Sequence, residues 1–275
     1  SRGLGDVYKR QGFWPLFLPL CIIKRGRPAG RRRGRTMDFS LNEQEKMLQN
    51  MARDFARRDI APRAADIDRT NNFPADMAAA LAERGLRGLP FPVNYGGGGA
   101  GYTGYVLALE QVCQASMSVG AIMAVNTVPQ EGIYRFGTEE QKQRLLRPLV
   151  EGKKLAGIGF TEPDTGSDPR MVKTVARREG DGWKINGQKM FMSLASVLDY
   201  VLLFARQADG DGLNAYIVEG KAKGFSVQER LETMGLRGLD TSIVNLDDVY
   251  VPGEKLIGQE GQGFLMGRIE ESFLS

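Results

Sequence analysis

One change of hydrophobic period constrains the fold of this chain more than any other feature of its sequence. Before about residue 152, apolar side chains recur every three or four positions, as in Met47, Met51 and Phe55, which is the spacing of an amphipathic helix. After that point the period is two, and turn signals return roughly every ten residues, which is typical of a small sheet domain. The sequence therefore predicts an α+β fold, with an N-terminal all-α helical domain over 37–153 and a small antiparallel β-sandwich or barrel domain over 154–258.

Two local signals predict boundaries within these domains. Ser40 and Glu43 have the spacing of a capping box, which marks the start of a helix. Asn186-Gly187 is the strongest hairpin signal in the chain and predicts a turn between two short strands. The resulting strand order places the loop 161–168 and the segment 191–193 on neighbouring strands of one sheet.

The net charge of +4 is distributed unevenly. Residues 1–36 hold ten of the 37 Lys and Arg residues and one of the 33 Asp and Glu residues, so the rest of the chain is mildly acidic. An acidic body argues against a nucleic-acid groove. The apolar run 12–23 is too short to span a bilayer of about 30 Å as a helix, and we predict no membrane partner. Residues 6–11 resemble a translated sequencing-library adapter, so we interpret 1–36 as non-native upstream sequence.

The chain contains no histidine and two cysteines, Cys21 and Cys113. The lack of histidine excludes Ser-His-Asp and Cys-His catalysis and most zinc sites, so we predict no metal site. Two cysteines far apart in sequence form no disulfide framework, and a reducing compartment, the cytoplasm, is the default.

A glycine-rich stretch, 95–101, satisfies the spacing G-x-G-x-x-G. A dinucleotide fingerprint also needs a strand before it and an acidic residue about twenty positions after it. Pro90 and Pro92 precede this stretch, and no acidic residue lies near the required distance. We therefore reject a Rossmann interpretation and expect a loop between helices.

Two segments of the β region carry hydroxyl groups close to glycine and aromatic residues: 159–168, GFTEPDTGSD, and 189–193, KMFMS. Hydroxyls beside free backbone amides can bind a phosphate or the polar edge of a ring. By turn chemistry alone, the first segment is equally a plain Ser/Thr/Gly turn that ends in a cap at Asp168. The residues by themselves leave both interpretations open.

The first segment resembles the flavin loop of the acyl-CoA dehydrogenase family, whose pattern is Thr-Glu-Pro, two free positions, then Gly-Ser-Asp. Phe191-Met192-Ser193 is similar to the Trp-Ile-Thr step of that family, and 136–142, 234–238 and 247–252 add further likeness. Serine at 193 keeps the hydroxyl, and phenylalanine at 191 keeps the ring but loses the indole N–H.

The resemblance implies FAD as cofactor and an acyl-CoA thioester as substrate. It implies that Thr161 binds the polar edge of the flavin, that Phe191 packs on it and that Ser193 donates to the ring nitrogen that accepts hydride. Ser167 and the Gly166 backbone would hold the diphosphate or the pantetheine arm of the substrate. The full set of residues that it implies for the cofactor is Ile158, Phe160, Thr161, Gly166, Ser167, Phe191, Met192 and Ser193, with Ser167 also contacting substrate.

The family pattern continues after residue 258 into a helical bundle that carries the catalytic glutamate in most members. We expect 259–275 to be the truncated start of that bundle, so that the four-helix bundle and the general base are missing and the chain by itself is inactive. An electron-transfer flavoprotein as acceptor and a homo-oligomer, dimer or tetramer, are further implications of the resemblance. An acyl-CoA oxidase or flavin monooxygenase of the same fold and a non-catalytic acyl-CoA- or flavin-binding module remain the alternatives.

Overall fold

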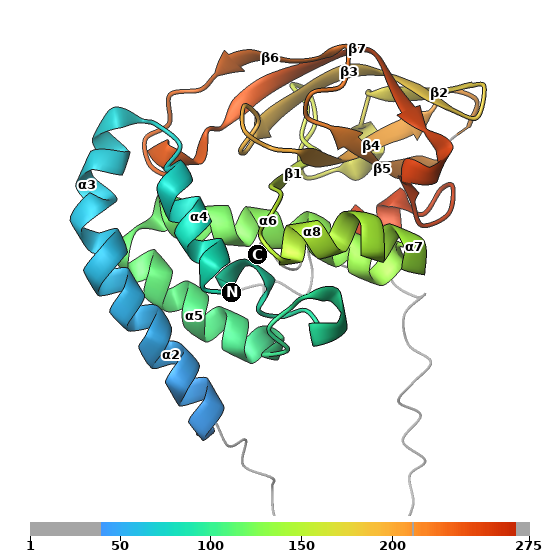
Figure 1. Cartoon of the computed structure of the whole chain (residues 1–275). Helices are drawn as coiled ribbons and strands as arrows, with labels where there is room; N and C mark the ends of the chain where they lie inside the picture. Colours follow the sequence, from blue (N-terminus) through green and yellow to red (C-terminus); the bar gives the residue numbers. More distant parts are fainter. Residues whose placement is uncertain (1–39, 211, 268–275) are drawn as a thin grey trace, which may run out of the picture. The chain divides into compact units, whose positions relative to one another are not determined.

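The computed structural model describes residues 40–210 and 212–267 (Figure 1). The described residues after Ser40 belong to one compact unit, Leu41–Ser275. The interpretation of 1–36 as upstream sequence lies outside the described residues, and so does the interpretation of 259–275 from residue 268 onward. The predicted order of a helical region followed by a β domain is confirmed.

The helical region runs from residue 43 to residue 150, blue to green in Figure 1. Two of its helices pass into π-helical segments, Ala56–Ile60 and Lys142–Leu146. The α-helices are α2 (Glu43–Phe55), α3 (Ala61–Thr70), α4 (Ala75–Glu83), α5 (Gly101–Ala115), α6 (Met117–Phe136), α7 (Glu139–Gln141) and α8 (Arg147–Val150). No helix in the described part of the chain has both the length and the apolar character needed to cross a membrane.

The capping box of α2 lies two residues later than the sequence predicts. Asn42 is the N-cap: its side-chain oxygen accepts from the Glu45 amide at 2.9 Å, and the Glu45 carboxylate accepts from the Asn42 amide at 2.9 Å. Asn42 and Glu45 have the same three-residue spacing as Ser40 and Glu43. The prediction of Ser40 as the cap was wrong because both pairs satisfy the pattern and only the second meets the helix start.

The glycine-rich stretch lies between a 3₁₀ turn, Val93–Tyr95, and α5, with no strand before it. A Cβ on Gly97 would lie 2.1 Å from the Phe91 carbonyl oxygen, so no larger residue fits there. The amides of Gly98 and Gly99 donate to the carbonyls of Gly88 and Phe91 at 3.1 and 2.9 Å. The glycines therefore serve close backbone packing between helices.

Within the described residues, the β domain is one sheet of eight strands, in the order β6-β7-β3-β2-β4-β5-β8, and β1 pairs with β4 outside this path. Its strands are β1 (Ala156–Gly159), β2 (Val175–Glu179), β3 (Gly182–Met192), β4 (Tyr200–Gln207), β5 (Leu213–Glu219), β6 (Phe225–Arg230), β7 (Ser242–Pro252) and β8 (Leu256–Ile257). Most pairs are antiparallel, as predicted, but β4 pairs parallel with both β1 and β2, so the sheet is mixed.

Strand β4 is buried on both faces. Val201, Leu203 and Ala205 belong to one hydrophobic cluster, and Leu202 and Phe204 belong to another that also holds side chains of α6 and α8. Successive residues of a strand point to opposite faces, so β4 contributes to two cores. The alternating side chains of β4 therefore link the sheet to the helices, and its backbone pairs with β1.

Asn186-Gly187 is not a hairpin turn, and this prediction was wrong. Strand β3 runs unbroken through it, and the tight connection lies between β2 and β3 at 180–181. The Asn186 side chain instead binds Asp248 on β7, accepting from its amide at 2.9 Å and donating to its carboxylate at 2.8 Å. Gly187 is needed because a Cβ would lie 2.4 Å from the Thr174 hydroxyl oxygen.

Candidate flavin and acyl-CoA site

The loop that follows β1 is a closed turn. Glu162 and Thr165 exchange backbone hydrogen bonds at 2.9 and 3.2 Å. The Thr165 hydroxyl donates to the Asp168 carbonyl at 2.8 Å, and the Asp168 carboxylate accepts from the Arg170 amide at 3.0 Å. Thr165 therefore uses its hydroxyl within the turn, whereas Gly166 and Ser167 are exposed at its tip.

The residues at the start of this loop pack against β4. The Phe160 ring meets the Phe204 ring edge to face, with 4.9 Å between their centroids. Ile158 and Phe160 are half-buried against the cluster that contains Phe204. Thr161 is half-buried, and its carbonyl accepts from the Met190 amide at 2.8 Å.

The end of β3 presents Phe191 outward. Phe191 has a left-handed backbone, φ 55°, and its side chain is 59% exposed. Met192, by contrast, is buried in the core, so only its backbone can reach a ligand. Ser193 is half-buried just beyond the strand. The sequence carries no sign of this backbone conformation at Phe191, because a positive φ is expected of glycine and not of an aromatic residue.

The two hydroxyl-bearing segments do come together, but not on neighbouring strands. β1 pairs with β4, and β3 pairs with β2 and β7. The hydrogen bond from the Met190 amide to the Thr161 carbonyl joins the segments directly. The described residues contain no ladder between β1 and β3, so the expected arrangement on adjacent strands is replaced by contacts between the ends of the two strands.

A buried ion pair lies where the two segments meet. The Lys189 ammonium donates to the Glu162 carboxylate at 2.7 Å and to the Phe160 carbonyl at 3.1 Å. Lys189 is fully buried and Glu162 is 5% exposed. The Glu162 carboxylate also accepts from the amides of Lys173 and Thr174, at 2.6 and 3.0 Å. These two side chains form the Glu162–Lys189 pair.

The environment of the Glu162–Lys189 pair shifts both titrations. Burial lowers the pKa of Lys189 to about 8, although the charge of Glu162 opposes this. Burial acts to raise the pKa of Glu162, but the Lys189 ammonium and the hydrogen bonds to the carboxylate outweigh it and lower that pKa overall. Both groups are therefore ionised at neutral pH. The sequence contained one signal for this pair: Lys189 lies in step, at every second residue, with the buried Trp183 and Ile185 of β3.

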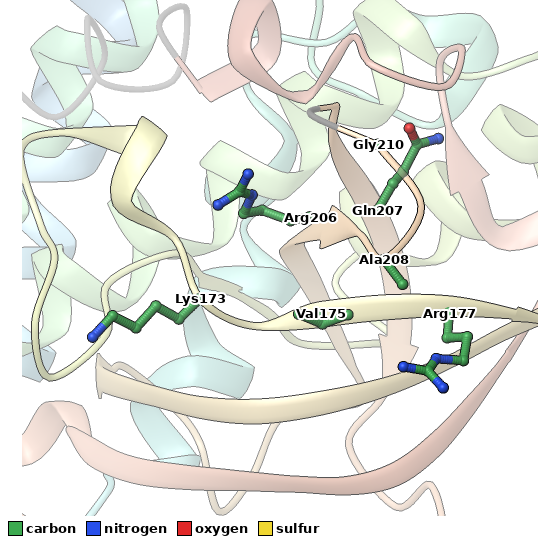
Figure 2. A pocket seen from close by; sticks show the side chains of 7 residues that line it. All are labelled: Lys173, Val175, Arg177, Arg206, Gln207, Ala208 and Gly210. Carbon is green, nitrogen blue, oxygen red and sulfur yellow. The ribbon is translucent and has the colours of Figure 1, made fainter.

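A basic pocket of about 590 Å³ lies beside the same loop (Figure 2). Its cations are Arg177 on β2, Arg206 on β4 and Lys173, which lies two residues before β2. Lys173 forms an ion pair with Asp164 of the loop at 2.6 Å. The remaining lining residues are Val175, Gln207, Ala208 and Gly210. No pattern in the sequence indicates this pocket, because its residues come together only through the parallel pairing of β2 with β4.

Two family models match the chain. Residues 42–153 match the N-terminal domain of acyl-CoA dehydrogenase, and residues 157–249 match its middle domain. The chain belongs to the acyl-CoA dehydrogenase family. The family assignment made from the two motifs is thereby confirmed.

Curated relatives and solved structures agree with this assignment. The chain is 37% identical to the short-chain specific acyl-CoA dehydrogenase of Clostridium acetobutylicum, over 83% of this chain and 61% of that protein. It is 34% identical to a 3-(aryl)acrylate reductase of Clostridium sporogenes, over 81% of this chain and 60% of that protein. The butyryl-CoA dehydrogenase of Megasphaera elsdenii superposes with a TM-score of 0.83 at 30% identity, covering 86% of this chain and 64% of that one.

The chain thus spans about 60% of the length of these two curated relatives. A glutaryl-CoA dehydrogenase from Mycobacterium smegmatis, 27% identical with a TM-score of 0.77 over 85% of this chain and 61% of that one, was solved in complex with FADH2. The family uses FAD.

The residues of this chain fit a flavin ring. Phe191 offers a large exposed aromatic face. Within the residues that the structure describes, the side-chain hydroxyls of Thr161, Ser167 and Ser193 make no hydrogen bond to protein. Exposed apolar surface next to uncommitted donors is what a flat ring with a polar edge requires. The roles of the individual residues remain predictions.

Proposed function

We propose that this chain supplies one wall of the active site of an FAD-dependent acyl-CoA dehydrogenase. The observation that carries the proposal is the bonding of 160–162 to Lys189 and Met190, which brings the segment with Thr161 next to the segment with Phe191 and Ser193. Bound FAD would accept the hydride that leaves the β carbon of an acyl-CoA thioester while a base takes the α proton. We assign that base to none of the described residues.

In this proposal each side chain has a distinct task. Phe191 packs on the ring and excludes water from one of its faces. Thr161 and Ser193 donate hydrogen bonds to its polar edge and fix its orientation. Ile158 and Phe160 pack against β4 and support the loop. The backbone of Met192 lies at the end of β3 beside the ring. Gly166 and Ser167 bind a diphosphate or the pantetheine arm.

The basic pocket supports a substrate that carries phosphate. Coenzyme A is polyanionic, and guanidinium groups bind phosphate through paired N–H donors. Lys173 contacts the hydroxyl-bearing loop through Asp164, so one cation of the pocket lies beside that loop. An acyl-CoA thioester would extend from the ring toward these cations.

The names of the relatives include both dehydrogenases and reductases. The acryloyl-CoA reductase (NADH) of Anaerotignum propionicum is 35% identical over 85% of this chain and 61% of that protein. Reduction is the reverse of dehydrogenation: it would take the α,β-unsaturated thioester and reduced flavin in place of the saturated thioester and oxidised flavin, so both directions fit the site. We propose dehydrogenation, with an electron-transfer flavoprotein as acceptor; an acyl-CoA oxidase is the alternative, and oxygen consumption by the substrate-reduced enzyme distinguishes it. We also propose a cytoplasmic homo-oligomer.

Titration of the purified 275-residue chain with FAD tests the flavin site. We expect flavin fluorescence to be quenched on binding, and we expect Ser193→Ala to raise the dissociation constant by about tenfold, the equivalent of 1.4 kcal/mol. Ser226→Ala is the matched control, because Ser226 is exposed on the edge strand β6. Wild-type protein that leaves FAD fluorescence unchanged at all concentrations would exclude a flavin site formed by this chain alone.

A further inference from the structure

The Glu162–Lys189 pair connects three separate segments at the edge of the proposed flavin site. The carboxylate accepts hydrogen bonds from Lys189 on β3 and from the amides of Lys173 and Thr174 ahead of β2. The ammonium also donates to the carbonyl of Phe160, at the start of the loop. Both carboxylate oxygens and the ammonium are thus engaged within one buried network.

A buried ion pair is not the most stable way to fill this space. Removing two charges from water costs several kcal/mol for each, and replacement by apolar side chains of similar size is often neutral or stabilising. Apolar packing, however, has no direction. A charged pair with four hydrogen bonds specifies one relative placement of the segments that it joins, because each bond requires a particular angle and distance.

The segment next to the pair needs such support. Lys189 faces Val244 across the sheet and Met192 faces Ser242, so β3 holds one more residue than β7 between these points. Phe191 lies in this irregular stretch with a left-handed backbone, φ 55°, which is unfavourable for an aromatic residue. Strained conformations of this kind persist only where the surrounding structure holds them. The hydrogen bond from Met190 to Thr161 and the ion pair of Lys189 hold it from one side.

We propose that Glu162 and Lys189 are positioning residues, which hold Thr161 and the 191–193 segment in the relative placement that the flavin site requires. The inference rests on the proposed function, because it concerns the same flavin. Both side chains are buried, so the pair acts through the loop and through the irregular end of β3.

Three variants of the 275-residue chain separate positioning from simple stability. Lys189→Met leaves the Glu162 charge buried without its partner, so this variant loses both stability and geometry. The double variant Lys189→Met/Glu162→Gln removes both charges and keeps a side-chain carbonyl that can accept from one of the two amides. Lys184→Met is the matched control, because Lys184 lies on the same strand and pairs with Glu179 at 3.1 Å on the surface.

Two measurements are made on each variant: FAD titration by fluorescence, and hydrogen exchange of the FAD-free protein over residues 161–174. We expect the double variant to melt close to wild type, to bind FAD about tenfold more weakly, a difference of 1.4 kcal/mol, and to quench bound flavin less at saturation. We expect its amides at 162 and 174 to exchange faster by about tenfold or more, because the loop opens locally. The control should match wild type in all of these.

The outcomes separate this inference from the proposed function. A double variant that is folded and binds FAD as wild type does, with unchanged quenching, would overturn the positioning role, since stability would then account for the pair. If Lys189→Met does not fold, the double variant decides the question. If wild-type protein binds no FAD, the proposed function fails, and unchanged exchange at 162 and 174 in the double variant would show that the pair does not hold the loop either.

Discussion

Arg87 is the residue whose removal we expect to reveal most about how the helices support the site. Its guanidinium is buried and donates to the carbonyls of Gly152 and Lys154 and to the side-chain oxygen of Asn126. The same Asn126 oxygen accepts from the amide of Ala156, the first residue of β1, at 2.9 Å. Arg87 therefore fixes the chain where it leaves the helices and enters the strand that leads to the flavin loop.

The magnitude for Arg87→Met follows from these contacts. Each hydrogen bond to a charged group contributes about 1.5–3 kcal/mol, and each buried acceptor left without a donor costs about 1–3 kcal/mol. The variant also regains the energy of burying a charge, which is large enough here to lower the pKa of Arg87 to about 10. We expect a net loss of about 3–5 kcal/mol, because the three hydrogen bonds and the orphaned acceptors together outweigh the regained energy of desolvation.

Urea unfolding followed by far-UV circular dichroism measures this loss. With a slope of about 1–3 kcal/mol/M, the midpoint of Arg87→Met should fall by at least about 1 M. The control is Arg144→Met, since Arg144 is 57% exposed and its partners Glu140 and Glu254 lie on the surface; we expect a change below about 1 kcal/mol. A midpoint for Arg87→Met within the error of wild type would refute the view that Arg87 anchors β1.

Three further outcomes are expected. Phe204→Ala should destabilise the fold by about 3–5 kcal/mol in urea, because the ring is fully buried in β4; a loss below about 1 kcal/mol would contradict this packing. Gly187→Ala should lower the melting temperature, since its Cβ would lie 2.4 Å from the Thr174 hydroxyl oxygen, and an unchanged melt would show that β3 adjusts freely. Because Glu162 has a lowered pKa in the folded state, its ionised form stabilises the fold at neutral pH, and this contribution is lost as pH falls through that pKa. The stability difference between wild type and Glu162→Gln should therefore shrink from pH 7 to pH 3, and a constant difference would argue against the pair.

Two short sequence motifs were enough to propose most residues of the candidate site. The sequence pointed to the hydroxyls of Thr161, Ser167 and Ser193 and to the ring of Phe191; among the described residues these hydroxyls make no hydrogen bond to protein, and the ring is exposed. Residue spacing did not identify the start of α2 correctly, because two pairs of residues match the capping-box pattern. Ser40 and Asn42 both head a possible capping box, and the choice of Asn42 depends on where α2 begins to pack.

Periodicity and short motifs are properties of neighbours in the chain, so the residues alone predicted the change from helices to strands near residue 153, the family and the two segments of the candidate site. Three features emerge only in the folded chain: Asn186-Gly187 lies inside a strand, β1 and β2 both pair with β4, and Lys189 meets Glu162. These features depend on which distant segments become adjacent when both faces of β4 are buried. The energy of burying that surface is shared by the whole sheet, and no short stretch of sequence carries it alone.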